Sequence, residues 1–480
     1  MSGHDDTKAK GGIIRFLIDN SILLILGAVI ALVWANAAAK NGSTSYQEFI
    51  HFDVRTLWGG GDDHHAETPP VISDQHDSNS NADDHSTDSD KASDAEGTAV
   101  GSDSDDKHAD QDDHKDGDHK DGVSHGDDEH GDDEHSGHNW YNLLFIVNDV
   151  LMALFFAIAA KEVWESMLPG GSLSNPRKAA TPLMATVGGI AGPALVYVGG
   201  CYFTGSMSDL GRGWAVPCAT DIAFSYLVAR MIFGGSHPAI AFLLLLAIAD
   251  DAAGLAILAV FYPQAPIELQ WLGLSVAAMA LAFVMKKMKI TSHWAYFLVP
   301  GVMSWFSFYN AHVHAALGLV PIIPFLPHAH TDLGVFASGE ARRTDTLNEF
   351  EHFWKTPVEC ILGLFGLVNA GVILSSLGNG TWLVLAGLLI GKPLGITLMT
   401  LLAEKGFKLE KPAGMDYRHV VTLGAVAGIG FTVALFVSSA AFPVAGPIQD
   451  SVKMGALLSF GAAPLSIIIA KVLRIKPEKD

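Results

Sequence analysis

Two adjacent carboxylates lie inside a long apolar run of the sequence. The stretch LAIADDAAGLAIL contains Asp250 and Asp251, and the surrounding run, from about Phe242 to Phe261, has no basic residue. An ionisable side chain at membrane depth costs ~2.5 kcal/mol or more, so this pair indicates a function. Adjacent residues of a helix point about 100° apart, which predicts a different role for each carboxylate. Close carboxylates titrate as a coupled pair that exchanges protons, and when deprotonated they offer oxygen ligands to a small cation. A buried, salt-bridged pair with only a structural role is the alternative.

Further polar residues lie in two other apolar segments. In GWAVPCATDIAF, Thr220 and Asp221 come shortly after a proline, and this order predicts an interrupted helix. The glycine-rich segment GAVAGIGFTVALF contains Thr432. Its Gly424 and Gly428 favour close helix packing over a break.

One lysine also lies in the middle of an apolar segment. Lys392 precedes Pro393 in GLLIGKPLGITL. A lone ammonium group is unfavourable at membrane depth, so the intramembrane aspartates are its expected partners.

The segments that carry these residues are long enough to cross a membrane as helices. About 20 apolar residues span the ~30 Å hydrocarbon core. The sequence contains twelve such windows, at 14–36, 141–163, 181–202, 214–232, 238–261, 270–286, 292–308, 312–327, 355–376, 381–403, 419–441 and 453–473. We therefore expect an all-α polytopic membrane protein with about 12 transmembrane helices.

The basic residues indicate how these helices are oriented, because lysine and arginine are enriched in short cytoplasmic segments. With the N-terminus inside, alternate connections carry most of them, such as Arg177, Lys286 and Lys405. This pattern predicts an even number of spans with both termini cytoplasmic. A cleaved signal peptide is the alternative for the first span, since basic residues precede it and the small residues ANAAA follow it.

The acidity of the chain comes from one segment. The 480 residues are 49% hydrophobic and carry a formal net charge of −21, yet Asp62–His138 alone carries −22. This segment repeats Asp, His, Gly, Ser and Lys and has few apolar residues, which predicts a disordered loop outside the membrane. Its eleven histidines suit weak binding of zinc, nickel or copper, without the fixed spacing of a defined metal site.

We accordingly divide the chain into three parts. Residues 1–36 form the cytoplasmic N-terminus and the first span, residues 37–140 form an external loop with the acidic, His-rich insert, and residues 141–480 form the remaining spans with the ion site and a cytoplasmic C-terminus. The three cysteines give neither a disulfide framework nor zinc-ligand spacing.

Four motifs together carry a resemblance to a known family. ATDIAF, AIADDAAGLAILAVFY, LIGKPLGI and AGIGFT, in this order and at these separations, resemble the NhaA family of sodium/proton antiporters, and FGLVNAGV (Phe365–Val372) adds to the likeness. The resemblance covers the chain except the insert. It implies inverted repeats with two broken helices that cross at the membrane midplane.

The resemblance also implies what the protein does. It implies electrogenic antiport in a bacterial cell inner membrane, with more protons carried inward than sodium ions outward, and a role in pH homeostasis. It implies a transporter and not an enzyme, without a cofactor or a nucleic-acid partner, in contact with membrane lipid. Acceptance of Li⁺ and assembly as a homodimer are open alternatives.

Individual roles can be carried over by position. Na⁺ is expected at Asp251 and Asp250, with Asp251 as the principal ligand and Asp250 either paired with Lys392 or taking a proton. Thr220 and Asp221 are expected at the helix crossing, together with Thr432 of the glycine-rich segment. Helix N-terminal ends are partly positive and C-terminal ends partly negative, so Asp221 would offset the former and Lys392 the latter.

The expected cytoplasmic funnel departs from the family pattern. Glu162 and the pair Glu351 and His352 match it, but the second glutamate expected four residues after Glu162 is replaced by Ser166, with Glu165 one residue earlier. Lys355 stands where a histidine is common in the family. The pH response predicted for Glu162, Glu165, Glu351 and His352 therefore depends on an altered set of side chains.

Two other classes of protein also place aspartates in a membrane. A divalent-metal transporter would explain the His-rich loop, but it predicts His and carboxylate pairs at i, i+4 within spans, which only His312 and His314 approach. An intramembrane aspartyl protease would place its two aspartates on separate helices in a GxGD-type motif, and neither ADD nor ATD has that motif.

Overall fold

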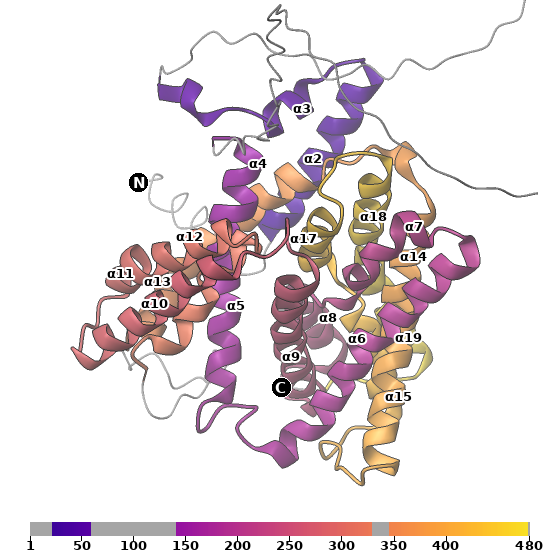
Figure 1. The fold of residues 1–480 in the computed structure, drawn as a ribbon. Coiled ribbons are helices and arrows are strands. Elements are labelled where there is room, and N and C mark those ends of the chain that lie inside the picture. Colours follow the sequence, from indigo (N-terminus) through magenta and orange to yellow (C-terminus); the bar gives the residue numbers. More distant parts are fainter. Residues whose placement is uncertain (1–21, 59–140, 329–344, 479–480) are drawn as a thin grey trace, which may run out of the picture. The chain divides into compact units, whose positions relative to one another are not determined.

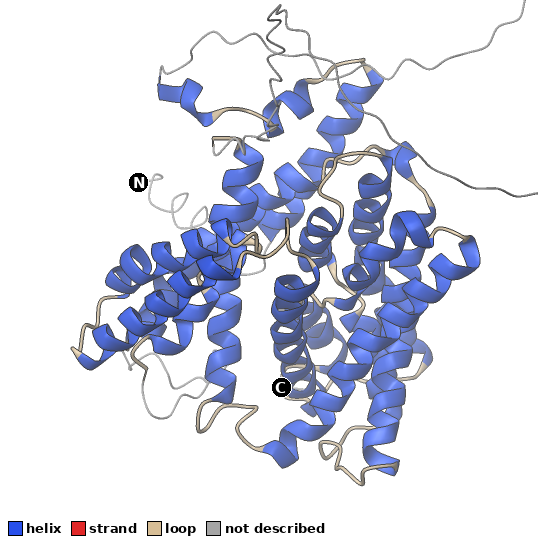
Figure 2. Ribbon diagram, viewed as in Figure 1, coloured by secondary structure: helices blue, strands red, loops and turns tan. Residues whose placement is uncertain are grey.

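The computed structural model describes residues 22–58, 141–328 and 345–478. Within these ranges the chain is helical and has no strand, apart from an isolated bridge between Asp53 and Asn142 (Figure 2). The prediction of an all-α polytopic membrane protein is confirmed. The chain divides into two compact units, Met1–Gly60 with Asn139–Asp480 as one and Gly61–His138 as the other. The predicted acidic insert is the second unit and lies outside the described residues.

The helical elements of the first unit can be followed along the chain in Figure 1. Up to the middle of the chain they are α2 (Ile22–Lys40), α3 (Ser45–Ile50), η1 (Val54–Trp58), α4 (Leu143–Phe145), η2 (Ile146–Leu151), α5 (Met152–Met167), α6 (Pro176–Thr204), α7 (Met207–Leu210), η3 (Gly211–Cys218), α8 (Ile222–Phe233) and α9 (Pro238–Phe261). They continue as α10 (Leu269–Lys287), α11 (His293–Tyr296), η4 (Phe297–Gly301), α12 (Val302–Asn310), η5 (Ala315–Leu317), η6 (Val320–Phe325) and α13 (Thr346–Asn369). The last elements are η7 (Leu374–Ser376), α14 (Asn379–Ala386), η8 (Gly387–Gly391), α15 (Lys392–Lys405), α16 (Tyr417–Ala427), α17 (Phe431–Ala441), α18 (Pro447–Leu458), η9 (Ser459–Gly461) and α19 (Ala462–Val472).

Seven helices of the described chain are long and apolar enough to cross a membrane. Two further pairs qualify as bent spans, α7–η3 with α8 at 53° and α16 with α17 at 50°. The other three predicted windows fall on the shorter or more polar segments His293–Asn310, Ala315–Phe325 and α13. The number of twelve spans therefore stays a prediction.

Helix α9 carries the aspartate pair and begins at clear sequence signals. His237 Nδ1 accepts a hydrogen bond from the Ala239 N–H at 3.1 Å, and Pro238 fills the first helical position, where no N–H is needed. From there the helix continues for 24 residues without a break. Asp250 and Asp251 lie near its middle, far from either end.

Glycines bring α6 and α15 into close contact. Gly188 and Gly192 of α6 lie so near Gly391 and Gly395 that a Cβ on any of them would overlap the facing backbone. Small residues four apart allow helix backbones in a membrane to approach in this way. Lys392 directly follows Gly391 in this contact, and its side chain is fully buried.

The two bent spans meet at their breaks. Residues 219–221 separate η3 from α8, and residues 428–430 separate α16 from α17. The Asp221 N–H donates to the Ile429 carbonyl oxygen at 2.7 Å, which joins the two breaks directly. The interruption expected after Pro217 is therefore present. Both glycines of the second segment are closely packed, as expected: a Cβ on Gly424 would lie 2.7 Å from Pro393 Cα, and a Cβ on Gly428 would lie 2.7 Å from the Leu388 carbonyl oxygen. The expectation that this packing excludes a break was wrong, because α16 ends at Ala427 and Gly428 also lies in the break.

Candidate ion-binding site

Asp221 caps two helices at the crossing. Its Oδ1 accepts from the Phe224 N–H of α8 at 3.3 Å, and its Oδ2 accepts from the Thr432 N–H of α17 at 3.3 Å and also from the Thr432 hydroxyl. The first N–H groups of a helix have no partner within the helix and carry partial positive charge. One buried carboxylate thus satisfies the N-terminal ends of both half-helices.

The carbonyl end of α16 is also satisfied by side chains. The Thr220 hydroxyl donates to the Ala427 carbonyl oxygen at 3.3 Å, and the Ser225 hydroxyl donates to the Val426 carbonyl oxygen at 3.1 Å. Both hydroxyls are buried. Unpaired backbone groups are costly where water is excluded, so these contacts make the break between α16 and α17 tolerable.

Lys392 pairs with the first aspartate of α9. Its ammonium lies 3.0 Å from Asp250 Oδ2 and also donates to the carbonyl oxygen of Cys218, the last residue of η3. The lysine follows the π-helical turn η8, a local irregularity that is frequent at functional positions. Lysine and Asp250 are both buried, with 0% and 2% of their side chains exposed.

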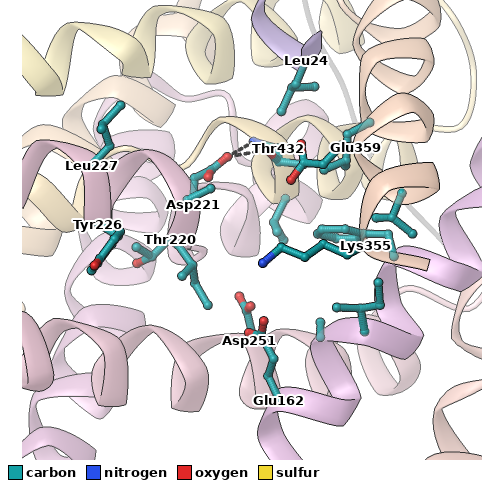
Figure 3. Close-up of a pocket in the computed structure, with 18 of the residues that line it drawn as sticks. Leu24, Glu162, Thr220, Asp221, Tyr226, Leu227, Asp251, Lys355, Glu359 and Thr432 are labelled. Atoms are coloured by element: carbon teal, nitrogen blue, oxygen red, sulfur yellow. Dashed lines mark hydrogen bonds between the residues drawn. The ribbon is translucent and has the colours of Figure 1, made fainter. Parts of the chain in front are cut away.

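Asp251 has different surroundings from Asp250. It lines a cavity of about 470 Å³ together with Glu162, Thr220, Asp221 and Thr432. Figure 3 shows the Asp251 and Glu162 carboxylates close together, across the cavity from Asp221 and Thr432. Cavity oxygens from α5, α9, α17 and the break before α8 therefore converge on one space, and such hard donors suit an alkali cation or a proton.

The predicted funnel residues separate into two groups. Glu162 and Glu351 line this cavity, along with Lys355. Glu165 is 2% exposed and pairs with Lys161, while His352 is exposed on α13 and is not among the cavity residues. The structure therefore brings only part of the predicted funnel set to the site.

Sequence reasoning missed Lys161. This lysine is 1% exposed, and its ammonium pairs with Glu165 on its own helix and with Glu351 on α13. It directly precedes Glu162 in an apolar segment, so the rule that singled out Lys392 could have found it. Three further cavity residues were also missed: Tyr226, Arg230 and Glu359.

A second polar cluster surrounds Asp149 of η2. His314 Nδ1 lies 3.4 Å from Asp149 Oδ1, Gln264 donates to the same oxygen at 3.4 Å, and the Trp305 indole donates to the Asp149 carbonyl oxygen at 2.8 Å. His312, the other histidine of the pair noted above, joins it only through its backbone: its carbonyl oxygen accepts from the Gln264 N–H at 2.9 Å. No group of three or more His, Cys, Asp or Glu side chains in the described ranges is placed to hold a metal ion, which gives the metal-transporter alternative no support there.

Comparison with known proteins identifies a family. A family model described as Na⁺/H⁺ antiporter 1 matches residues 131–471. A protein named Na(+)/H(+) antiporter NhaA from Jannaschia sp. (strain CCS1) is 52% identical over 360 residues, which cover 70% of this chain and 85% of the relative. Proteins of the same name from Geobacter sulfurreducens and Geotalea uraniireducens are each 50% identical, over 69% of this chain and over 87% and 86% of their own lengths. All residues of the candidate site lie within the matched range.

Proposed function

The chain belongs to the Na⁺/H⁺ antiporter 1 family and exchanges sodium ions for protons across a membrane, and from this premise we propose that Asp251 is the carboxylate for which the two ions compete. The observation that carries the proposal is the difference between the two neighbouring aspartates. Asp250 is neutralised by Lys392, whereas Asp251 faces a cavity. Only the second is open to an arriving ion.

Sodium binds through oxygen atoms that the cavity provides. Asp251 supplies the charge, and Asp221, Thr220 and Thr432 supply further oxygens from the crossing of the two bent spans. A proton on Asp251 removes both its negative charge and its capacity as a ligand, so proton binding and sodium binding exclude each other. No separate coupling device is needed. Li⁺ has the same charge and prefers the same hard ligands, so we expect it to be accepted as well.

Lys392 and Asp221 hold the crossing together electrostatically. The ammonium group faces the carbonyl end of η3, and the carboxylate faces the N-terminal ends of α8 and α17. Each charge therefore opposes the partial charge of the helix ends that it meets. With Lys392 and Asp221 in place, the partial charges of the helix ends stay compensated. The ion site can then open to one side of the membrane and afterwards to the other.

Charge placement supports a cytoplasmic opening of the cavity. The connections that follow α5 and α15 lie at one end of the bundle, with α3, α7 and the start of α18 at the other (Figure 1). Arg177 and Lys405 mark the first end, and basic residues favour the cytoplasmic side. The cavity reaches toward this end through Arg230, near the end of α8, and Lys355, in the first half of α13. Both termini are then cytoplasmic, and the acidic insert is external.

The transport cycle follows from this arrangement in a bacterial inner membrane. A proton arriving from outside on Asp251 is released into the cavity, and cytoplasmic sodium takes its place before the site opens outward. Exchange of more than one proton per sodium ion moves net charge inward, so the membrane potential assists extrusion by about 2.3 kcal/mol per charge per 100 mV.

The deciding experiment measures proton flux in inside-out membrane vesicles. Addition of Na⁺ should collapse an imposed pH gradient in vesicles with the wild-type protein, and addition of K⁺ should not. Vesicles with Asp251→Asn at the same protein level should show no response. Sodium-dependent flux that survives this substitution would assign the exchange to another carboxylate.

A further inference from the structure

Glu351 and Lys355 of α13 are placed one helical turn apart, yet they do not pair. A glutamate four residues before a lysine is the favoured spacing for an ion pair along a helix. Here Glu351 instead binds Lys161 of α5. The contact between helices takes the carboxylate that Lys355 would otherwise use.

Lys161 has no capacity left for another partner. An ammonium group has three N–H donors. Lys161 contacts Glu165, Glu351 and Asn348 Oδ1, the last at 3.4 Å, and its side chain is 1% exposed. The Lys161 charge is thus buried at the contact between α5 and α13, and its ion pair fixes the Glu351 carboxylate there.

Lys355 has the opposite environment. None of the ion pairs found within residues 22–58, 141–328 and 345–478 includes it. Its side chain is exposed and lines the cavity that contains Asp251. Figure 3 shows its amine pointing into the open space between Asp221 and Asp251.

We propose that Lys355 is a tethered cation that competes with sodium in the cavity and thereby sets the sodium affinity of the transporter. The inference rests on the proposed function, in which sodium reaches Asp251 through this cavity. Lysine is suited to the role because its charge is compact and its four-carbon stem is flexible. A sodium ion that approaches Asp251 must displace this ammonium group or tolerate its repulsion, and it can do so because no ion pair of the described residues holds the group.

Substitution of Lys355 tests the proposal through the KM for sodium. Lys355→Gln should lower this KM about five-fold, which corresponds to about 1 kcal/mol of removed repulsion, a magnitude expected for charges in a partly solvated cavity. Lys355→Glu should lower it further. Lys355→Arg keeps the charge and should stay within about two-fold of wild type. The side chain is exposed, so none of these changes should impair folding.

Two controls separate this role from a general effect of charge. Lys405→Gln removes an exposed lysine at the end of α15, outside the cavity, and should leave the sodium KM unchanged. Raising the ionic strength with choline chloride should shrink the difference between wild type and Lys355→Gln, because salt screens repulsion in a solvated cavity.

All variants are assayed in inside-out vesicles, with Asp251→Asn alongside. An unchanged or raised KM in Lys355→Gln, with Asp251→Asn inactive, overturns the tethered-cation proposal and leaves the ion site standing. An equal fall in KM for Lys355→Gln and Lys355→Arg would also overturn it, since the charge would then be irrelevant. Activity in Asp251→Asn would instead contradict the proposed function itself.

Discussion

The Lys392 ammonium lies 3.0 Å from Asp250 Oδ2, while the next residue, Asp251, faces the cavity. Two carboxylates that are adjacent in the sequence therefore have different partners. The turn of about 100° between neighbouring side chains of a helix is the cause. This division leads to separate predictions for the two aspartates and for the lysine.

Asp251→Asn should abolish sodium/proton exchange and leave the folded protein intact, because the substitution removes the ligand and the proton carrier without changing side-chain size. Asp250→Asn should weaken sodium binding less but impair coupling severely, since Lys392 then loses its counter-ion. Sodium binding by isothermal titration and proton flux in vesicles measure the two effects separately. A proportional loss of binding and flux in both variants would mean that the aspartates share one role.

Lys392→Ala should lower thermal stability as well as transport. Removing one partner of a buried ion pair leaves the other charge uncompensated, and such changes cost roughly 3–5 kcal/mol. Lys392→Arg keeps the charge and should retain partial activity and most of the stability. Melting temperatures of the purified variants in detergent check this. Equal melting temperatures for wild type and Lys392→Ala would refute the structural half of the prediction.

Asp221→Ala should destabilise the helix crossing by about 1–2 kcal/mol or more, because two half-helices lose a cap together. Asn is also a good cap, so Asp221→Asn should recover most of that stability. Thr432→Val removes only the hydroxyl and keeps the backbone N–H, and it should cost less than Asp221→Ala. Thermal unfolding in detergent ranks the three variants. A Thr432→Val variant as unstable as Asp221→Ala would place the main contribution in the hydroxyl.

Gly395→Ala should destabilise the protein through a clash, since the added Cβ would overlap the Gly188 carbonyl group across the contact between α6 and α15. Overpacking of this kind costs about 1–3 kcal/mol. Gly199→Ala is the matched control, because no atom lies within 4 Å of its added Cβ and alanine has the higher helix propensity. We expect a lower melting temperature for Gly395→Ala and an unchanged or higher one for Gly199→Ala. Equal melting temperatures for the two variants would show that α6 and α15 can move apart without loss of stability.

Deletion of residues 62–137 should leave exchange intact at high salt. The segment Asp62–His138 holds a net charge of −22, whereas the aspartates, the lysines and the residues that line the cavity all lie outside it. Its charge should only concentrate cations outside the membrane, over a distance of about 10 Å at 0.1 M salt. Flux measured at several salt concentrations, with and without zinc, compares the two forms. A correctly inserted but inactive deletion at high salt would make the segment part of the transport machinery.

The sequence by itself determined the fold class and the identity of the charged residues in the membrane. Asp221, Asp250, Asp251 and Lys392 stand out because ionisable groups are rare in apolar segments, and that signal needs no structure. The interruption after Pro217 was also readable, because proline removes a backbone donor. The family motifs around these residues indicated antiport before any contact was known.

Only the tertiary structure decided which charges meet. Spacing along the chain could not tell whether Lys392 faces Asp221, Asp250 or Asp251, because the answer depends on how closely α6 and α15 approach through their glycines. The break at Gly428 was missed for a related reason: a small residue permits close packing and a break together, and Gly428 packs against the Leu388 carbonyl oxygen while it also ends α16. In the same way, the pairing of Lys161 with Glu351 depends on the contact between α5 and α13, which are far apart in the sequence. Charge pairing in a membrane is a property of packed helices, so it follows from their arrangement and not from any one segment.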